Sequence, residues 1–232
     1  RRTIRSQSLM LRSEYDPALG SKVVMAASAD KYNNPDKTQL AYQLSGSHYV
    51  SSNTLIRAGL QQAHRSSFLL NSFLDLDIPI KQPPNQRLSF EGDPDANLLS
   101  FRTYELGLRK QSGFGGWIDA EIFYTSIDDF SEFVQGTPFT DNGQTVIPST
   151  LQSIKTKANQ LGLTLSWFYL QGNWSLNSFI TLQKTKVEDQ VVSLVNPVEY
   201  TDRDDKGTPT VFGGMNFNWK PDIDWNINSS LY

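Results

Sequence analysis

The chain has 232 residues, a formal net charge of -3 and no cysteine. The absence of cysteine excludes disulfide bonds and thiolate metal sites, and Lys and Arg form no cluster of the kind that binds nucleic acid. No stretch approaches the roughly 18 apolar residues of a membrane helix, although that criterion does not detect membrane strands.

Polar and apolar residues alternate along most of the chain with the period of two that is typical of β-strands. Several of these segments reach ten residues or more. Strands of soluble proteins cluster near about five or six residues, whereas about nine to eleven tilted residues cross a bilayer. We predict ten strands, over residues 7-15, 22-32, 38-50, 54-64, 100-111, 116-127, 157-170, 173-187, 209-220 and 224-232.

The connections between these strands alternate between short and long. The short ones are turns rich in Gly, Pro, Asn, Asp and Ser, and the long ones are links of up to about 35 residues. This alternation places all tight turns at one end of a sheet, as in outer-membrane barrels, whereas a Greek-key sandwich mixes lengths at both ends. The turns are 16-21, 51-53, 112-115, 171-173 and 221-223, and the links are 33-37, 65-99, 128-156 and 188-208.

Each predicted strand has one apolar and one polar face. Leu163, Leu165 and Trp167 alternate with Thr164 and Ser166. We interpret the apolar face as facing lipid and the polar face as lining a lumen, because charged residues are unfavourable in hydrocarbon. The predicted lumen-facing charges are Arg57, Glu105, Arg109, Asp119 and Glu121, with Arg12 and Glu14 on the first strand.

Aromatic residues gather at the ends of the apolar face. Trp167, Tyr169 and Trp174 flank one tight turn, and Trp219 and Trp225 flank another. Aromatic rings with a polar tip are enriched at the headgroup layer of membranes, so we predict that these five lie at a membrane interface. The alternative is that they fill the rim of a sandwich core.

Five segments resemble barrel strands of TonB-dependent receptors, the outer-membrane transporters of Gram-negative bacteria. The segment YELGLR (104-109) is the most specific of them, and the order and spacing of the segments agree over residues 38-232. His64 stands where the family has an aromatic residue, and Gln160 and Leu161 depart from its pattern. The other four are TLIRAGLQQAHRSSF (54-68), DAEIFYTSIDDF (119-130), ANQLGLTLSWFY (158-169) and the final hairpin, 208-232.

The resemblance implies an all-β fold: an antiparallel, up-and-down transmembrane β-barrel of about 22 strands that encloses a plug domain. Residues 1-232 are then a single segment from the C-terminal side of that barrel, without the plug and the closing hairpin. No signal peptide is recognisable, and we expect the chain to be part of a longer protein. The implied location is the outer membrane, and the implied partners are its lipid, the plug, the TonB complex and a small ligand.

The implied function is uptake of a scarce ligand, such as a siderophore, cobalamin, glycan or peptide, with energy from TonB. The lumen charges then hold the plug or meet the ligand. Aromatic residues on the long links are candidates for ligand capture, although they can equally pack against each other. They are Phe68, Phe73, Phe90, Phe130, Phe133 and Phe139.

Motifs for enzyme chemistry are missing. His48 and His64 lie on different predicted strands, and no nucleophile elbow, zinc-protease helix or P-loop occurs. The acidic segment 201-207 lacks the spacing of a calcium loop, so we expect a solvated outer loop and neither a metal nor a cofactor. Two alternatives to energised uptake stay open: a passive porin-type barrel and a soluble β-sandwich that binds a partner.

Overall fold

The fold is dominated by one large antiparallel sheet. A computed structural model describes residues 3-65, 68-80, 85-113, 115-154, 156-188, 190-191, 199-200, 203-222 and 224-232. The ten strands along this sheet are β1 (Ser6–Tyr15), β2 (Ser21–Tyr32), β3 (Thr38–Ser51), β4 (Thr54–His64), β7 (Ser100–Ser112), β8 (Gly116–Asp128), β12 (Lys157–Gln171), β13 (Trp174–Glu188), β17 (Val211–Trp219) and β18 (Ile227–Leu231). They pair in chain order, and the short strand β16 (Arg203–Asp204) also pairs with β13. The prediction of ten up-and-down strands is confirmed.

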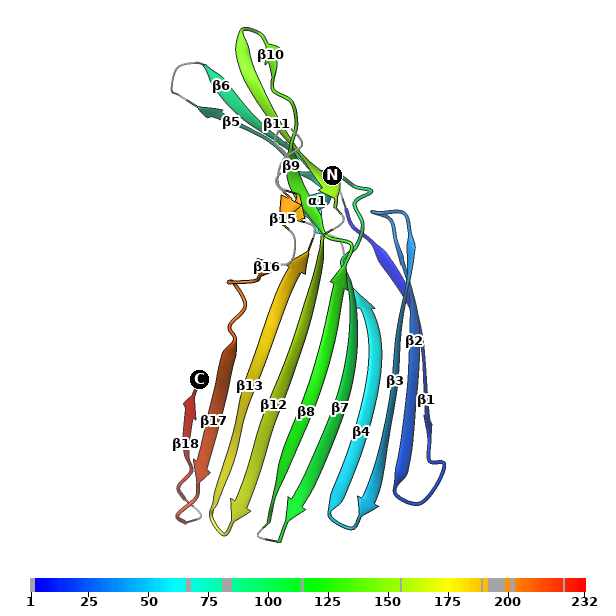
Figure 1. The fold of residues 1–232 in the computed structure, drawn as a ribbon, viewed down its shortest axis with the longest axis vertical. Helices are drawn as coiled ribbons and strands as arrows, with labels where there is room; N and C mark the ends of the chain where they lie inside the picture. Colours follow the sequence, from blue (N-terminus) through cyan, green and yellow to red (C-terminus); the bar gives the residue numbers. More distant parts are fainter. Residues whose placement is uncertain are drawn as a thin grey trace.

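The ten strands form a curved wall with different connections at its two ends (Figure 1). Tight turns join β1 to β2, β3 to β4, β7 to β8, β12 to β13 and β17 to β18 at one end. The longer links lie at the other end, as the alternation of loop lengths predicts. We call these the turn end and the loop end.

The two longest links contain a second sheet, which projects beyond the loop end of the wall (Figure 1). Its strands are β5 (Asp75–Ile80), β6 (Gln86–Glu91), β9 (Ser131–Gln135), β10 (Phe139–Asp141) and β11 (Gln144–Ser153). The short helix α1 (Leu69–Phe73) precedes it, and β14 (Gln190–Val191) pairs with β15 (Glu199–Tyr200) in the link after β13. The sequence predicts only links here, because β6 and β11 come from separate links and pair in parallel, and Pro79 and Pro148 interrupt the local pattern.

The two faces of the wall differ as predicted. The face that we call outer carries exposed apolar residues, among them Leu106 (60% exposed), Ile118 (60%) and Leu161 (58%). Among the described residues no second layer covers this face, which is the opposite of a sandwich core. The most buried apolar side chains, Val134 and Val146, are instead in the second sheet.

Within the part of the chain that the structure describes, no helix is both long and apolar enough to cross a membrane.

Candidate functional site

The five predicted lumen charges lie on the inner face of three neighbouring strands, and four of them form one cluster. Register sets Arg57 of β4 opposite Gly107 of β7, and Gly107 opposite Glu121 of β8. One row nearer the turn end, Arg109 of β7 stands opposite Asp119 of β8. Because residues of equal parity share a face, the alternation read from the sequence places these side chains on one side of the sheet.

Asp119 is the centre of an ion-pair cluster. Arg57 donates two hydrogen bonds of 2.7 Å to the two carboxylate oxygens of Asp119, and its Nη2 donates a third, of 2.6 Å, to Glu121. Arg109 donates from Nε to Oδ2 of Asp119 at 2.7 Å. The Asp119 side chain is only 7% exposed, so two guanidinium groups satisfy a carboxylate that is largely removed from water.

Glycine lets Arg57 reach across β7 to this carboxylate. A Cβ atom added to Gly107 would lie 2.5 Å from Cζ and 2.7 Å from Nε of Arg57. The arginine therefore lies flat on the glycine backbone instead of projecting from the wall. Phe123 lies on Gly162 of β12 in the same way, and its ring occupies the position that a Cβ atom would take.

An aromatic pair continues the cluster toward the turn end. Trp117 of β8 stacks on Phe168 of β12, with ring centroids 5.9 Å apart, and Arg109 lies over the Trp117 ring at 4.4 Å. Such a cation–π contact adds roughly 0.5–1 kcal/mol at an exposed site. Trp117 and Phe168 are not among the residues predicted for the site, although their parity with Asp119 and Ser166 places them on the inner face.

Glu105 is set apart from this cluster. It stands opposite Gly59 and Phe123 on the inner face, and a Cβ atom on Gly59 would lie 3.6 Å from its Oε2. Among the described residues, Glu105 has neither a hydrogen-bond nor an ion-pair partner. Its carboxylate is therefore available to a group from outside this stretch of wall.

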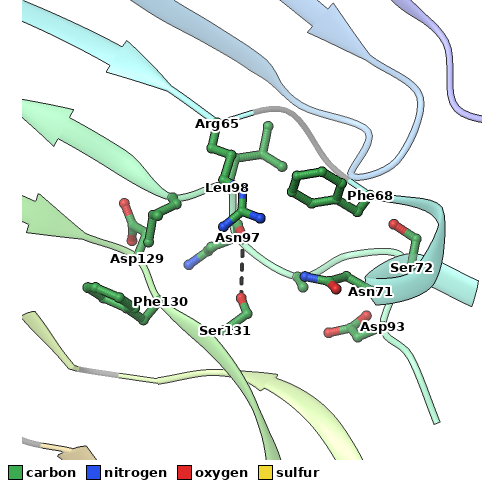
Figure 2. Close-up of a pocket in the computed structure, with 12 residues that line it drawn as sticks. Arg65, Phe68, Asn71, Ser72, Asp93, Asn97, Leu98, Asp129, Phe130 and Ser131 are labelled. Carbon is green, nitrogen blue, oxygen red and sulfur yellow. Dashed lines mark hydrogen bonds between the residues drawn. The ribbon is translucent and has the colours of Figure 1, made fainter. Parts of the chain in front are cut away.

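A second candidate site is a cavity of about 120 Å³ at the loop end, where the links after β4 and β8 meet (Figure 2). Arg65 lies over the ring of Phe68 at 4.2 Å, and Phe130 lines the opposite side. Ser131 donates to the backbone carbonyl of Asn97 at 3.3 Å, and the Asn97 N–H donates to Ser153, which ties the two links together. Asn71, Asp93 and Asp129 complete the polar lining.

The six predicted capture residues do not form one surface. Phe68 and Phe130 line this cavity, whereas Phe90 and Phe133 pack edge to face with centroids 5.7 Å apart. Phe139 is 52% exposed on β10. Phe73 ends α1 and is partly buried. Some of the six rings are therefore packed and others are accessible to a ligand. The role of these residues in ligand capture stays a prediction.

The predicted interface aromatics lie at the turn end. Trp167 and Trp219 are 48% and 43% exposed on the outer face, and Trp225, just before β18, is 63% exposed. Trp174 stands opposite Trp219 and lies 4.9 Å from Tyr169 between ring centroids. The rings gather as the sequence indicates, and a membrane interface at this level stays a prediction.

The two histidines and the acidic side chains lie as follows. His48 contacts Ser21, and His64 contacts Gln62 and the carbonyl of Leu40, so the two histidines belong to separate environments. In the described residues, no group of three or more His, Asp or Glu side chains is arranged to hold a metal ion. Residues 201-202 of the acidic loop lie outside the described residues.

Comparison with solved structures identifies the architecture. The chain is similar to the siderophore receptor PirA from Acinetobacter baumannii (TM-score 0.71, 14% identity, 97% of this chain and 32% of PirA). It is also similar to the ferric enterobactin receptor PfeA from Pseudomonas aeruginosa, solved as a variant (0.61, 11%, 98% and 39%), and to the outer membrane transporter YddB from Escherichia coli (0.62, 14%, 94% and 31%).

The chain therefore has the fold of one side of an outer-membrane receptor barrel, and it spans about a third of the length of these proteins. The predicted fold class is confirmed. No protein-family model and no curated protein matches the sequence.

Proposed function

We propose that this chain is part of the barrel of a receptor in the outer membrane of a Gram-negative bacterium, which takes up a scarce ligand with energy supplied through TonB. The observation that carries this proposal is the two-sided wall. It has an uncovered apolar outer face, a charged inner face, and the fold of receptors whose names describe siderophore and enterobactin binding.

The inner face favours a barrel that holds a folded plug over one that holds only water. Arg57 and Phe123 lie flat on Gly107 and Gly162, so long side chains follow the wall and leave the lumen open to a large insert. Most of the charge is neutralised inside the Arg57–Asp119–Arg109–Glu121 cluster.

Glu105 supplies the contact that the plug needs. It is a carboxylate without an ion-pair partner on the described wall, and a Lys or Arg of the plug would neutralise it. In this proposal Asp119 and the two arginines stiffen the wall, Glu105 receives the plug, and the cavity beside Phe68 lies on the ligand's entry side.

Conductance and uptake distinguish energised import from passive diffusion. The full-length protein, reconstituted in planar bilayers, is expected to conduct no steady current because the plug fills the barrel. Cells that express it are expected to accumulate the ligand, tested with a panel of iron-loaded siderophores, only when TonB is present. Steady ion current together with uptake that is independent of TonB would instead establish the porin alternative.

We further propose that the ligand is a siderophore. Two of the named relatives, PirA and PfeA, are described as siderophore and ferric enterobactin receptors. The accessible loop aromatics Phe68 and Phe139 suit a ligand with aromatic or apolar groups. Competition of the siderophore panel with cobalamin and oligosaccharides on the purified protein tests this step separately from transport.

A further inference from the structure

The apolar outer face ends in a basic rim at the loop end. Arg102 of β7, Lys157 of β12 and Lys184 of β13 are in phase with the apolar outward residues of their own strands, and these three strands lie side by side with β8 (Figure 1). Alternate residues of a strand share a face, so these cations stand on the side of the wall that is otherwise apolar. Charged side chains are unfavourable on a lipid-facing surface except near its edge.

At one place in this rim, two cations share a single carboxylate. Arg102 donates to Asp128 at 2.8 Å, and Lys157 lies 4.0 Å from the other oxygen of the same carboxylate. The two cationic side chains are 47% and 58% exposed, whereas Asp128 is 16% exposed beneath them. One carboxylate is thus shared by two cations. By contrast, Lys184 is matched by Asp204 at 3.0 Å.

The rim lies at the depth expected of lipid headgroups. Twelve residues separate Lys157 from Tyr169 at the turn end, which is about 40 Å along a strand and about 28 Å across a bilayer at a tilt near 45°. Directly below the rim, Tyr104 and Tyr124 lie side by side, and the Tyr124 hydroxyl donates to Asn159. From the rim toward the turn end, the outer face carries first cations, then tyrosines and then aliphatic side chains. This is the order in which such residues occur from the headgroup layer to the acyl chains of a membrane.

We propose that Arg102 and Lys157 bind the phosphate of a lipid headgroup in the leaflet beside the long loops. This rests on the proposed function, because the wall must span a membrane. A guanidinium has five N–H donors in a fork that suits phosphate, and Asp128 occupies only one side of it. The Asp128 carboxylate holds the two cations close together on the outer face of the wall, where both side chains are well exposed.

The opposite end of the wall offers a matched control. Lys110 stands on the outer face of β7, in phase with Arg102, at the turn end. It lies eight residues from Arg102 on the same strand, and it is exposed. Lys110→Gln removes the same charge from the same face at the other edge of the apolar band.

The test measures binding of bisphosphorylated lipid A to the full-length protein in detergent by native mass spectrometry. The same lipid without its phosphates, and inorganic phosphate alone, serve as comparisons. Arg102→Gln and Lys157→Gln are each expected to weaken lipid A binding about fivefold, and the double variant about 25-fold, because each cation near a charged surface contributes a similar factor. Lys110→Gln is expected to bind like the unchanged protein, and Arg102→Lys to retain part of the affinity.

Three results would overturn the headgroup site: equal binding of the dephosphorylated lipid, an equal loss in Lys110→Gln, or full competition by inorganic phosphate at the lipid's own concentration. Insertion into phosphatidylcholine vesicles is measured in parallel. A full-length protein that does not insert would refute the membrane placement, and the headgroup site with it. A protein that inserts and shows no phosphate dependence would refute the headgroup site alone.

Discussion

At the scale of single residues, the inner wall depends on glycine as much as on charge. Arg57 can reach Asp119 only because Gly107 leaves the intervening strand without a side chain. The same holds for Phe123 over Gly162. Small residues on β7 and β12 therefore determine where large residues of the neighbouring strands lie.

Gly107→Ala tests this dependence. The new methyl group would meet the Arg57 guanidinium, and we expect a loss of about 1–3 kcal/mol in the free energy of unfolding, as for other overpacked sites. The measurement is urea denaturation of the full-length protein in lipid vesicles. In an Arg57→Ala background the same change is expected to be nearly neutral. Gly113→Ala, where a Cβ atom meets nothing within 4 Å, is the control.

Asp119→Asn tests the centre of the charge cluster. The change leaves two arginines without their shared carboxylate, and hydrogen bonds to charged groups contribute about 1.5–3 kcal/mol each. We expect a loss of at least about 2 kcal/mol in the same denaturation measurement. Glu121→Gln removes one contact to Arg57 at a more exposed site, so its loss should be smaller. Equal losses would contradict the central position of Asp119.

At the scale of elements, each wall strand separates an apolar outer face from a polar inner face, which we assign to lipid and to the lumen. Leu106→Arg would place a charge among apolar residues in the middle of β7, and the expected loss in unfolding free energy is about 2–4 kcal/mol in vesicles. Gln61→Arg on the inner face of β4 should change stability by less than about 1 kcal/mol, since that face is polar. A reversed order of these two effects would invert the assignment of the faces.

The parallel pairing of β6 with β11 in the second sheet can be tested separately. Gln86 of β6 stands opposite Thr145 of β11, and the chain contains no cysteine that could interfere. Gln86→Cys with Thr145→Cys should form a disulfide on mild oxidation, because paired strands bring Cα atoms within the range of about 4.4–6.8 Å. The readout is a reducible shift in electrophoretic mobility. Gln86→Cys with Ser153→Cys, at the far end of β11, should remain unlinked.

At the scale of the whole molecule, the proposed contact of Glu105 with a plug can be tested. Glu105→Gln in the full-length protein should weaken the seating of the plug, raise bilayer conductance from none to intermittent openings, and increase sensitivity to large antibiotics. Gln61→Gly, on the same face, is the control for general loosening of the wall. Unchanged conductance in Glu105→Gln would remove this residue from the proposed contact.

How far the sequence predicts this molecule depends on the range of the interactions involved. Alternation within a strand is local, so the ten wall strands, their turns and the inward side of Arg57 and Asp119 follow from the sequence. The β6–β11 pair and the cavity beside Phe68 join residues from different links, and no local pattern encodes that pairing. Strand parity places Trp117 and Phe123 on the inner face. Their aromatic side chains do not indicate that face, because the rest of it is lined with polar and charged residues.

The separation of β6 from β11 along the chain also has a consequence for the order of folding. The β7–β8 hairpin lies between them, and its strands meet across a tight turn, whereas β6 and β11 come together only when the ends of that hairpin are already fixed. The loop-end sheet therefore completes after the wall. A refolding experiment should detect two phases, with protection of β8 amides from solvent exchange appearing before that of β11.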